Sequence, residues 1–151
     1  MLIHQLPKNN ELFSVTFTNF SERYYLKDFK KNYKGKQWDF TEQSIKQDLM
    51  RLRMENNTTQ FSSQIDELKY NDGEYLVKYD FKIALTNESP KTSGNRCVLY
   101  IDNSKNIINI LMIYGKTNLP KNKDETKFIM DELESHDFGI DNLDKLIKKR
   151  N

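Results

Sequence analysis

Cysteine and histidine are scarce in this chain, and their scarcity argues against several kinds of chemistry. The one cysteine, Cys97, lies in an apolar stretch and has no second cysteine for an internal disulfide, so it is interpreted as a small core residue and not as a nucleophile. The two histidines, His4 and His136, each lie near a terminus, which disfavours a paired-histidine nuclease and a histidine metal site. The CxxC, HExxH, GxGxxG and P-loop motifs are also missing. We expect no metal and no cofactor.

Long apolar runs are missing as well. No stretch approaches the roughly 18 residues that a membrane-spanning helix needs. Residues 1–5 lack the basic start and apolar block of a signal peptide. We therefore expect a reducing, cytoplasmic location and no membrane partner.

Charge of either sign does not dominate the chain. Its 24 basic and 22 acidic side chains give a net charge of +2, which is too mild to indicate nucleic-acid binding by itself. Residues 21–54 are more basic, with nine Lys or Arg against five Asp or Glu. This asymmetry alone favours a solvated, lysine-rich helix face over a surface for a polyanion.

The composition is compatible with one globular domain spanning residues 1–151. Hydrophobic residues make up only 36% of the chain, but aromatic residues supply 12%. Large rings bury much area each, so few residues can form a sufficient core. A chain of 151 residues is long enough for one such core and too short for two large ones.

Periodicity predicts the order of the elements. Alternating or continuous apolar residues predict strands at 12–19, 65–68, 75–83, 97–101 and 107–113. Apolar residues at helical spacing predict helices at 22–33, 39–56, 122–134 and 141–150. The expected N-caps are Ser21, Asp39 and Asn122. Residues 71–73, Asn-Asp-Gly, predict a tight turn, and residues 86–94 a polar loop.

This order defines an α+β class. Tight turns favour antiparallel neighbours, so we expect a small, mainly antiparallel sheet of four or five strands, with helices on one face and further helices at the C-terminus. The run 107–113 is apolar at nearly every position, which predicts a central strand covered at least partly on both faces.

Basic and phenolic side chains on the predicted strands are the best candidates for chemistry. Lys78 and Lys82 share a strand face, Tyr114 and Lys116 share another, and Arg96 begins the strand between them. If the strands are neighbours, these groups converge and can act on a phosphodiester without histidine. An arginine fork stabilises phosphate oxygens, crowded cations make one lysine a base, and a phenol donates a proton or stacks on a base.

A simpler interpretation is favoured by the residues alone. Lys78 and Lys82 are then solvated strand residues, and Tyr114 belongs to the core. The acidic residues between 124 and 134 have helix-surface spacing and an interleaved lysine, so they are interpreted as a solvated face.

The order of elements and motifs resembles the RelE/HigB branch of the RelE/ParE toxin superfamily. Residues 76–82 and a polar loop precede Gly94-Asn95-Arg96 and its strand, and an apolar strand then ends in Tyr114-Gly115-Lys116. In that branch a strand with a Gly-x-Arg start is followed by an apolar strand ending in Tyr-x-Lys. The resemblance covers roughly residues 17–133. Residues 1–11 are interpreted as an N-terminal leader, and 135–151 as a C-terminal extension.

The resemblance implies a RelE-like fold with a helical hairpin on the sheet and a bacterial, cytoplasmic toxin of a type II toxin-antitoxin system. It implies metal-independent, ribosome-dependent cleavage of mRNA by attack of the ribose 2′-hydroxyl on the scissile phosphate, and a cognate antitoxin as partner. On this basis Arg96 stabilises the phosphate, Lys78 or Lys82 is the base, and Tyr114 donates a proton or stacks on a base. The expected RNA-binding residues are Lys116, Lys91, Lys30 and Lys34.

Two other functions stay open. The chain can keep the fold without cleavage, as an inhibitor that binds a partner such as DNA gyrase or as a binding protein of a phage or mobile element. It can also be a regulatory domain whose basic first helix contacts nucleic acid.

Overall fold

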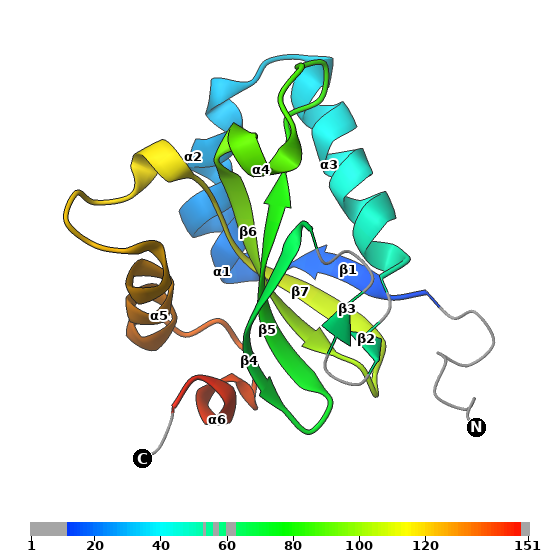
Figure 1. Ribbon diagram of the computed structural model, residues 1–151, viewed down its shortest axis with the longest axis vertical. Coiled ribbons are helices and arrows are strands. Elements are labelled where there is room, and N and C mark those ends of the chain that lie inside the picture. The colour runs from blue at the N-terminus through cyan, green and yellow to red at the C-terminus, as the bar shows by residue number, and fades with distance from the viewer. Residues whose placement is uncertain (1–11, 53, 56–57, 60–62, 149–151) are drawn as a thin grey trace.

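The structure is a computed structural model that describes residues 12–52, 54–55, 58–59 and 63–148. The predicted leader, residues 1–11, lies outside the described residues, as do the last three residues of the predicted C-terminal extension. A five-stranded sheet runs through the middle of the molecule, with helices on both of its faces (Figure 1).

The strands follow the order β1-β7-β6-β5-β4 across the sheet. β1 pairs with β7 in parallel, and every other pair is antiparallel. The predicted α+β class and the mainly antiparallel sheet are therefore confirmed. The bounds are β1 Ser14–Phe17, β4 Ile65–Asn71, β5 Glu74–Phe81, β6 Asn95–Asp102 and β7 Ile107–Gly115. A second, two-stranded sheet contains β2 Met54–Glu55 and β3 Thr58–Thr59.

The turn between β4 and β5 forms where the sequence predicts it. Asp72 and Gly73 adopt positive φ angles of 51° and 87°, as the two central residues of a type I′ hairpin turn require. This turn sets the register of β5, which carries two of the charged residues discussed below.

The first helical segment, residues 19–32, combines α1 Asn19–Ser21, the π-helical turn η3 Glu22–Leu26, α2 Lys27–Phe29 and the 3₁₀ turn η4 Lys30–Asn32. The prediction that Ser21 is its N-cap is wrong, because the Thr18 hydroxyl oxygen accepts from the Ser21 N–H at 3.0 Å. Ser21 is fully buried against the sheet, and its hydroxyl donates to the Ile110 carbonyl oxygen at 2.8 Å. Its role is to attach the helix to β7.

The helix α3, Lys36–Met50, is shifted from its predicted bounds. It begins after Gly35, whose φ of 61° suits glycine, and not at Asp39. It ends at Met50 and not near residue 56, because the chain then turns to bury Leu52 at 2% exposure. Residue 56 lies outside the described residues.

Two apolar cores lie on opposite faces of the sheet. On face 1, residues such as Val77, Leu99 and Ile108 pack against α3 and the helical segment 19–32. On face 2, residues such as Leu76, Val98 and Met112 pack against α5 Glu125–Ser135 and α6 Leu143–Ile147. The expectation of helices on one face is therefore wrong, because alternate residues of β5–β7 are apolar on both sides and both sides need cover.

The connections between the strands and helices differ from the predictions in smaller ways. The predicted polar loop 86–94 contains a short helix, α4 Pro90–Ser93, capped by the Ser89 hydroxyl. After β7 comes the 3₁₀ turn η5 Lys116–Asn118. The N-cap of α5 is Asp124, whose carboxylate accepts from the Lys127 N–H at 2.8 Å. Asn122 does not cap the helix, because it occupies a turn with a φ of 68°.

Candidate functional site

Strand pairing brings three of the predicted catalytic residues to one place. Arg96 on β6 lies opposite Tyr114 on β7 and opposite Asp80 on β5. Lys78 shares the face of Asp80, since residues two apart in a strand point to the same side. The four side chains lie on face 2, at the end of the sheet where β6 begins and β7 ends.

A carboxylate from α5 joins these side chains. Glu125 Oε2 accepts a hydrogen bond from the Tyr114 hydroxyl at 2.7 Å and lies 3.5 Å from Arg96 Nε. Its other oxygen, Oε1, lies 3.4 Å from Lys78 Nζ. Arg96 Nε also lies 3.0 Å from Asp80 Oδ1. Together Lys78, Asp80, Arg96, Tyr114 and Glu125 form what we call the ionic cluster.

The ionic cluster is layered by depth. Arg96 and Asp80 are each only 6% exposed. The side chains of Lys78 and Glu125 are 17% and 16% exposed and lie nearer the surface. Lys78 Nζ also lies 3.6 Å from Oδ2 of the exposed Asp66. A ligand from solvent therefore meets Lys78 and Glu125 first and Arg96 beneath them.

The deepest pair is imperfectly bonded. Arg96 Nε and Asp80 Oδ1 are close enough for an ion pair, yet both atoms are buried without a well-directed hydrogen bond. Nearly all buried polar groups in folded proteins have such a bond. The attraction between these two atoms is therefore mainly that of opposite charges.

Burial and neighbouring groups also shift the pKa values of two residues of the ionic cluster, Tyr114 and Asp80. Burial, reinforced by the hydrogen bond to Glu125, raises the pKa of Tyr114 far above its ordinary value, so the phenol stays protonated and donates its hydrogen bond to the Glu125 carboxylate. Burial raises the pKa of Asp80 above 3.8, although the neighbouring Arg96 opposes that shift.

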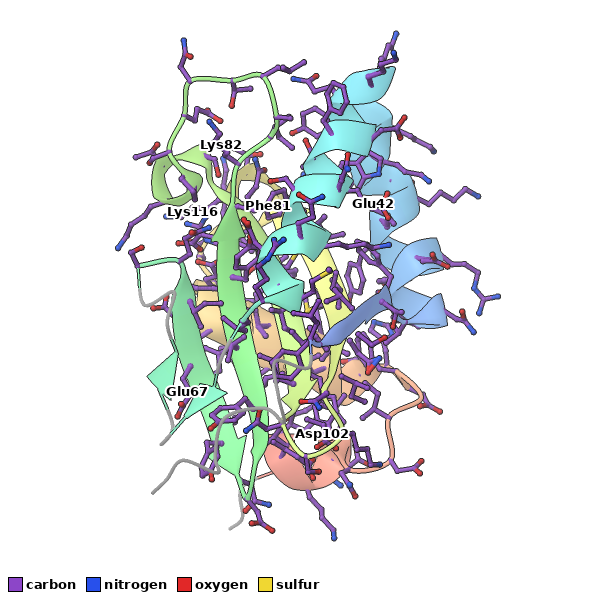
Figure 2. All side chains as sticks on the ribbon, turned by 90° about the vertical axis from the view of Figure 1, so that its right-hand side faces the viewer. Glu42, Glu67, Phe81, Lys82, Asp102 and Lys116 are labelled. Carbon is purple, nitrogen blue, oxygen red and sulfur yellow. The ribbon has the colours of Figure 1, made fainter. Side chains whose placement is uncertain are left out.

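Lys82 lies apart from these contacts. It follows the end of β5, is exposed, and its ammonium donates to the Thr86 carbonyl oxygen at 3.2 Å. Figure 2 shows Lys82 and Lys116 toward the same end of the molecule, opposite Asp102. The structure thus brings together Lys78, Arg96 and Tyr114 and leaves Lys82 at the rim.

The four predicted RNA-binding lysines are exposed. Lys116 begins η5, Lys91 lies in α4, and Lys30 and Lys34 lie at or just after the end of the helical segment 19–32. Figure 1 places α4, η5 and the connection from α2 to α3 at one end of the molecule. That is also the end at which β6 begins, but the segment that carries Lys30 and Lys34 packs on face 1, whereas the ionic cluster lies on face 2.

Glu125 is the site residue that the sequence interpretation missed. It was assigned to a solvated helix face, yet its side chain is mostly buried and contacts Lys78, Arg96 and Tyr114. The available signal was its position as the first residue of the helix that follows β7. Asp124 and Glu134 of the same acidic group are exposed, as expected.

Other kinds of site are not observed in the described part of the chain. No three His, Cys, Asp or Glu side chains converge there to hold a metal ion. No described helix combines the length and apolar character needed to cross a membrane. Cys97 is fully buried, and burial raises its pKa strongly, so its thiol is a core group.

Comparisons with protein families, with curated proteins and with solved structures find no match to this chain. Its function is therefore inferred from its own residues.

Proposed function

We propose that this chain is a cytoplasmic toxin of the RelE/HigB kind, a metal-independent endoribonuclease that cleaves mRNA on the ribosome and is masked by a cognate antitoxin. The observation that carries the proposal is the cross-strand meeting of Lys78, Arg96 and Tyr114. Arginine, lysine and a protonated phenol are together sufficient to bind a phosphodiester and to protonate its leaving group.

The order of elements also supports this proposal. A first strand, two helical segments and an antiparallel meander follow one another as in the resemblance. The exposed lysines at the end of the sheet that carries the ionic cluster offer a path for a polyanion. We further propose that the fold is RelE-like and that the chain forms one domain.

The reaction proposed for the ionic cluster is cleavage of one phosphodiester, in which one proton leaves the 2′-hydroxyl and another is given to the 5′-oxygen. The ribose 2′-oxygen attacks the adjacent phosphorus, and the bond from phosphorus to the 5′-oxygen breaks. Arg96 stabilises the charge that develops on the phosphate oxygens. Tyr114 donates its proton to the departing 5′-oxygen. Lys78 contributes positive charge, since its ammonium is paired with Glu125 and Asp66.

The base is better assigned to Glu125 than to a lysine. Lys78 is ion-paired with carboxylates, and Lys82 binds the Thr86 carbonyl oxygen. Glu125 carries the carboxylate nearest to both Arg96 and Tyr114 on the accessible side. A bound phosphate must displace this carboxylate from Arg96, after which the carboxylate can accept the 2′-hydroxyl proton.

The test is expression of the chain in bacteria, with growth and mRNA integrity measured together. The wild type should arrest growth and cleave translated messages. Arg96→Ala and the shape-preserving Tyr114→Phe should both relieve arrest, whereas the exposed Lys145→Ala on α6 should not. Arrest with intact messages would exclude cleavage, and full toxicity of both site variants would exclude this site.

One observation favours a second candidate, a non-cleaving inhibitor that binds DNA gyrase or a phage or mobile-element partner. The two cations of the ionic cluster are already matched by the carboxylates of Asp80 and Glu125. A neutral, closed cluster is what a purely structural role requires. Growth arrest with DNA damage signalling and no loss of mRNA would identify this function.

A further inference from the structure

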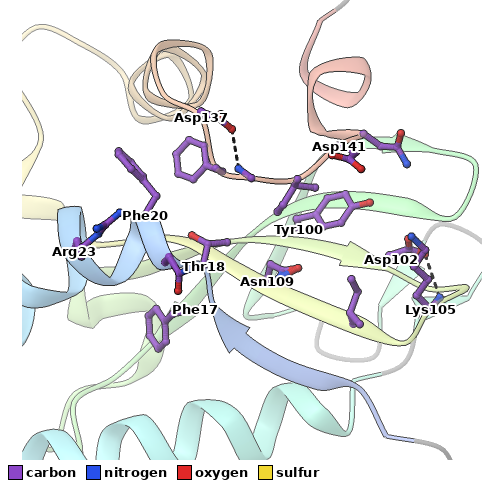
Figure 3. A pocket seen from close by; sticks show the side chains of 16 residues that line it. Phe17, Thr18, Phe20, Arg23, Tyr100, Asp102, Lys105, Asn109, Asp137 and Asp141 are labelled. Carbon is purple, nitrogen blue, oxygen red and sulfur yellow. Dashed lines mark hydrogen bonds between the residues drawn. The ribbon is translucent and has the colours of Figure 1, made fainter.

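A cavity lies at the other end of the sheet, away from the ionic cluster (Figure 3). It has a volume of about 600 Å³, within the range of small-molecule sites. It lies between the start of the helical segment 19–32 and the connection 136–142 that joins α5 to α6. None of the five residues of the ionic cluster lines it.

The floor of this cavity is polar, whereas the middle of face 2 is an apolar core. Tyr100 on β6 lies opposite Asn109 on β7, and Asp102 lies opposite Ile107. Further along the same face, under α5 and α6, Val98 and Met112 are fully buried in an apolar core. Asn109 is only partly buried, so its amide is available at the point where the helices leave the sheet uncovered.

Aromatic rings form one wall. Phe20 and Phe138, which both line the cavity, pack edge to face with their ring centres 5.0 Å apart. Tyr24 stacks on Phe20 at 4.9 Å and continues the aromatic surface outward. Rings of this kind bind flat heterocycles by stacking, with little dependence on the identity of the heterocycle.

Charged groups of both signs complete the lining. Among the described residues that line the cavity, the carboxylates of Asp102, Asp137 and Asp141 are accompanied by two cations, Arg23 and Lys105. Figure 3 shows Arg23 at one end of the cavity and Lys105 at the other. The carboxylates disfavour a phosphate at the centre, while they accept hydrogen bonds from hydroxyl and amino groups.

Asp102 is fixed in place before any ligand arrives. It is 4% exposed, and its Oδ1 accepts from the Ser104 N–H at 3.0 Å, the Ser104 hydroxyl at 2.8 Å and the Lys105 N–H at 3.2 Å. A carboxylate held in this way lowers the ordering cost of binding.

We propose that this cavity binds a nucleoside moiety. The base lies against Phe20 and the aromatic wall, the Asn109 amide bonds the edge of the base, and carboxylates such as Asp141 accept from the ribose hydroxyls. A phosphate attached to the sugar reaches Arg23 or Lys105 at an end of the cavity. The moiety is either a free nucleoside or an unpaired residue of RNA, and its binding here does not require that the chain cleaves RNA.

The experiment titrates the full chain with adenosine, guanosine, cytidine and uridine, followed by calorimetry and by NMR shifts. At least one nucleoside should bind saturably and shift signals of Asn109 and Phe138. Asn109→Leu and the exposed Asp141→Asn should each weaken binding about tenfold, as expected for one lost hydrogen bond to a held group. Ser44→Ala, in a separate cavity beside α3, should bind like the wild type.

The source of the moiety is decided by adding 5′-monophosphates and a short single-stranded RNA. Tighter binding of these ligands supports an RNA residue, and weaker binding supports a free nucleoside. Saturable binding by none of the ligands overturns the proposal. So does binding that shifts only signals of the ionic cluster, or equal affinity of both pocket variants with melting temperatures that show intact folds.

Discussion

Asp80 is a residue whose charge is costly in the folded chain. Its pKa lies above 3.8 because burial disfavours the carboxylate more than Arg96 favours it. The folded state then binds more protons than the unfolded state once the pH exceeds about 4, so this residue lowers stability as the pH rises through its raised pKa.

The stability advantage of the wild type over Asp80→Asn should therefore shrink as the pH rises from about 4 toward 7. Urea unfolding at several pH values measures it. Asp131→Asn is the matched control, because hydrogen bonding to Lys123 lowers the pKa of Asp131. The stabilising contribution of Asp131 should rise as the pH increases toward about 4 and then stay level, and equal slopes for both variants between about pH 4 and 7 would contradict the assignment.

Glu125 is the residue that best separates binding from cleavage. Removing its charge in Glu125→Gln removes an anion that competes with phosphate beside Arg96. RNA should bind about tenfold tighter or more, because two charges about 4 Å apart interact by about 1 kcal/mol in water and by about 4 kcal/mol near a protein surface. Cleavage should nevertheless be about 10²- to 10⁴-fold slower, because the base is lost.

The control for this prediction is Glu134→Gln, an exposed change on the same helix. It should leave both RNA binding and cleavage as in the wild type. Faster cleavage by Glu125→Gln would show that Glu125 only closes the site, and unchanged RNA binding would show that it does not compete with phosphate.

For the individual residues of the ionic cluster, the sequence predicted part of the arrangement. Lys78, Arg96 and Tyr114 could be placed together because strand parity and a short turn determine which side chains face one another. Lys82 has the same parity as Lys78, but β5 ends before it. Glu125 was missed because its contacts depend on where α5 docks, and sequence spacing carries no information about docking.

Among the helices, α5 is stabilised at its N-terminus by its capping residue, Asp124. Asp124→Ala removes the acceptor of the Lys127 N–H, and the free energy of unfolding should fall by about 1 kcal/mol. Thermal or urea unfolding measures the loss. Thr126→Ala, exposed in the same first turn, should cost much less, so equal losses would indicate a propensity effect and not a cap.

Element types were predicted better than element ends. Periodicity placed β5, β7 and the hairpin turn at residues 71–73, because alternation and turn chemistry are local. The caps were wrong at all three helix starts. Ser21, Asp39 and Asn122 have suitable side chains, but the helices start instead after Thr18, Gly35 and Asp124.

In the whole molecule, the five-stranded sheet contributes side chains to both apolar cores. Val77 and Leu76 are neighbours on β5 and bury on opposite faces, so neither core can loosen without disturbing strands that serve the other. The apolar run 107–113 indicated cover on both faces for one strand. That the whole sheet is covered on both faces could be concluded only once its strand order was known.

Unfolding should therefore be a single cooperative transition. Far-UV circular dichroism and the reactivity of Cys97 toward a thiol reagent should give the same urea midpoint, since Cys97 lies fully buried on face 1. Release of α5 and α6 before the thiol becomes reactive would contradict a shared core. The fluorescence of Trp38, also in the face 1 core, provides a third probe.

The passage of the chain from face 1 to face 2 sets an order of events during synthesis. The helices of face 1 and every strand of the five-stranded sheet precede residue 116, whereas the cover of face 2 is supplied by α5 and α6. A nascent chain that has just completed β7 presents Leu76, Val98 and Met112 to solvent until residues 125–147 leave the ribosome. Such a chain is a natural client for a chaperone, and a pause in translation at that point favours aggregation.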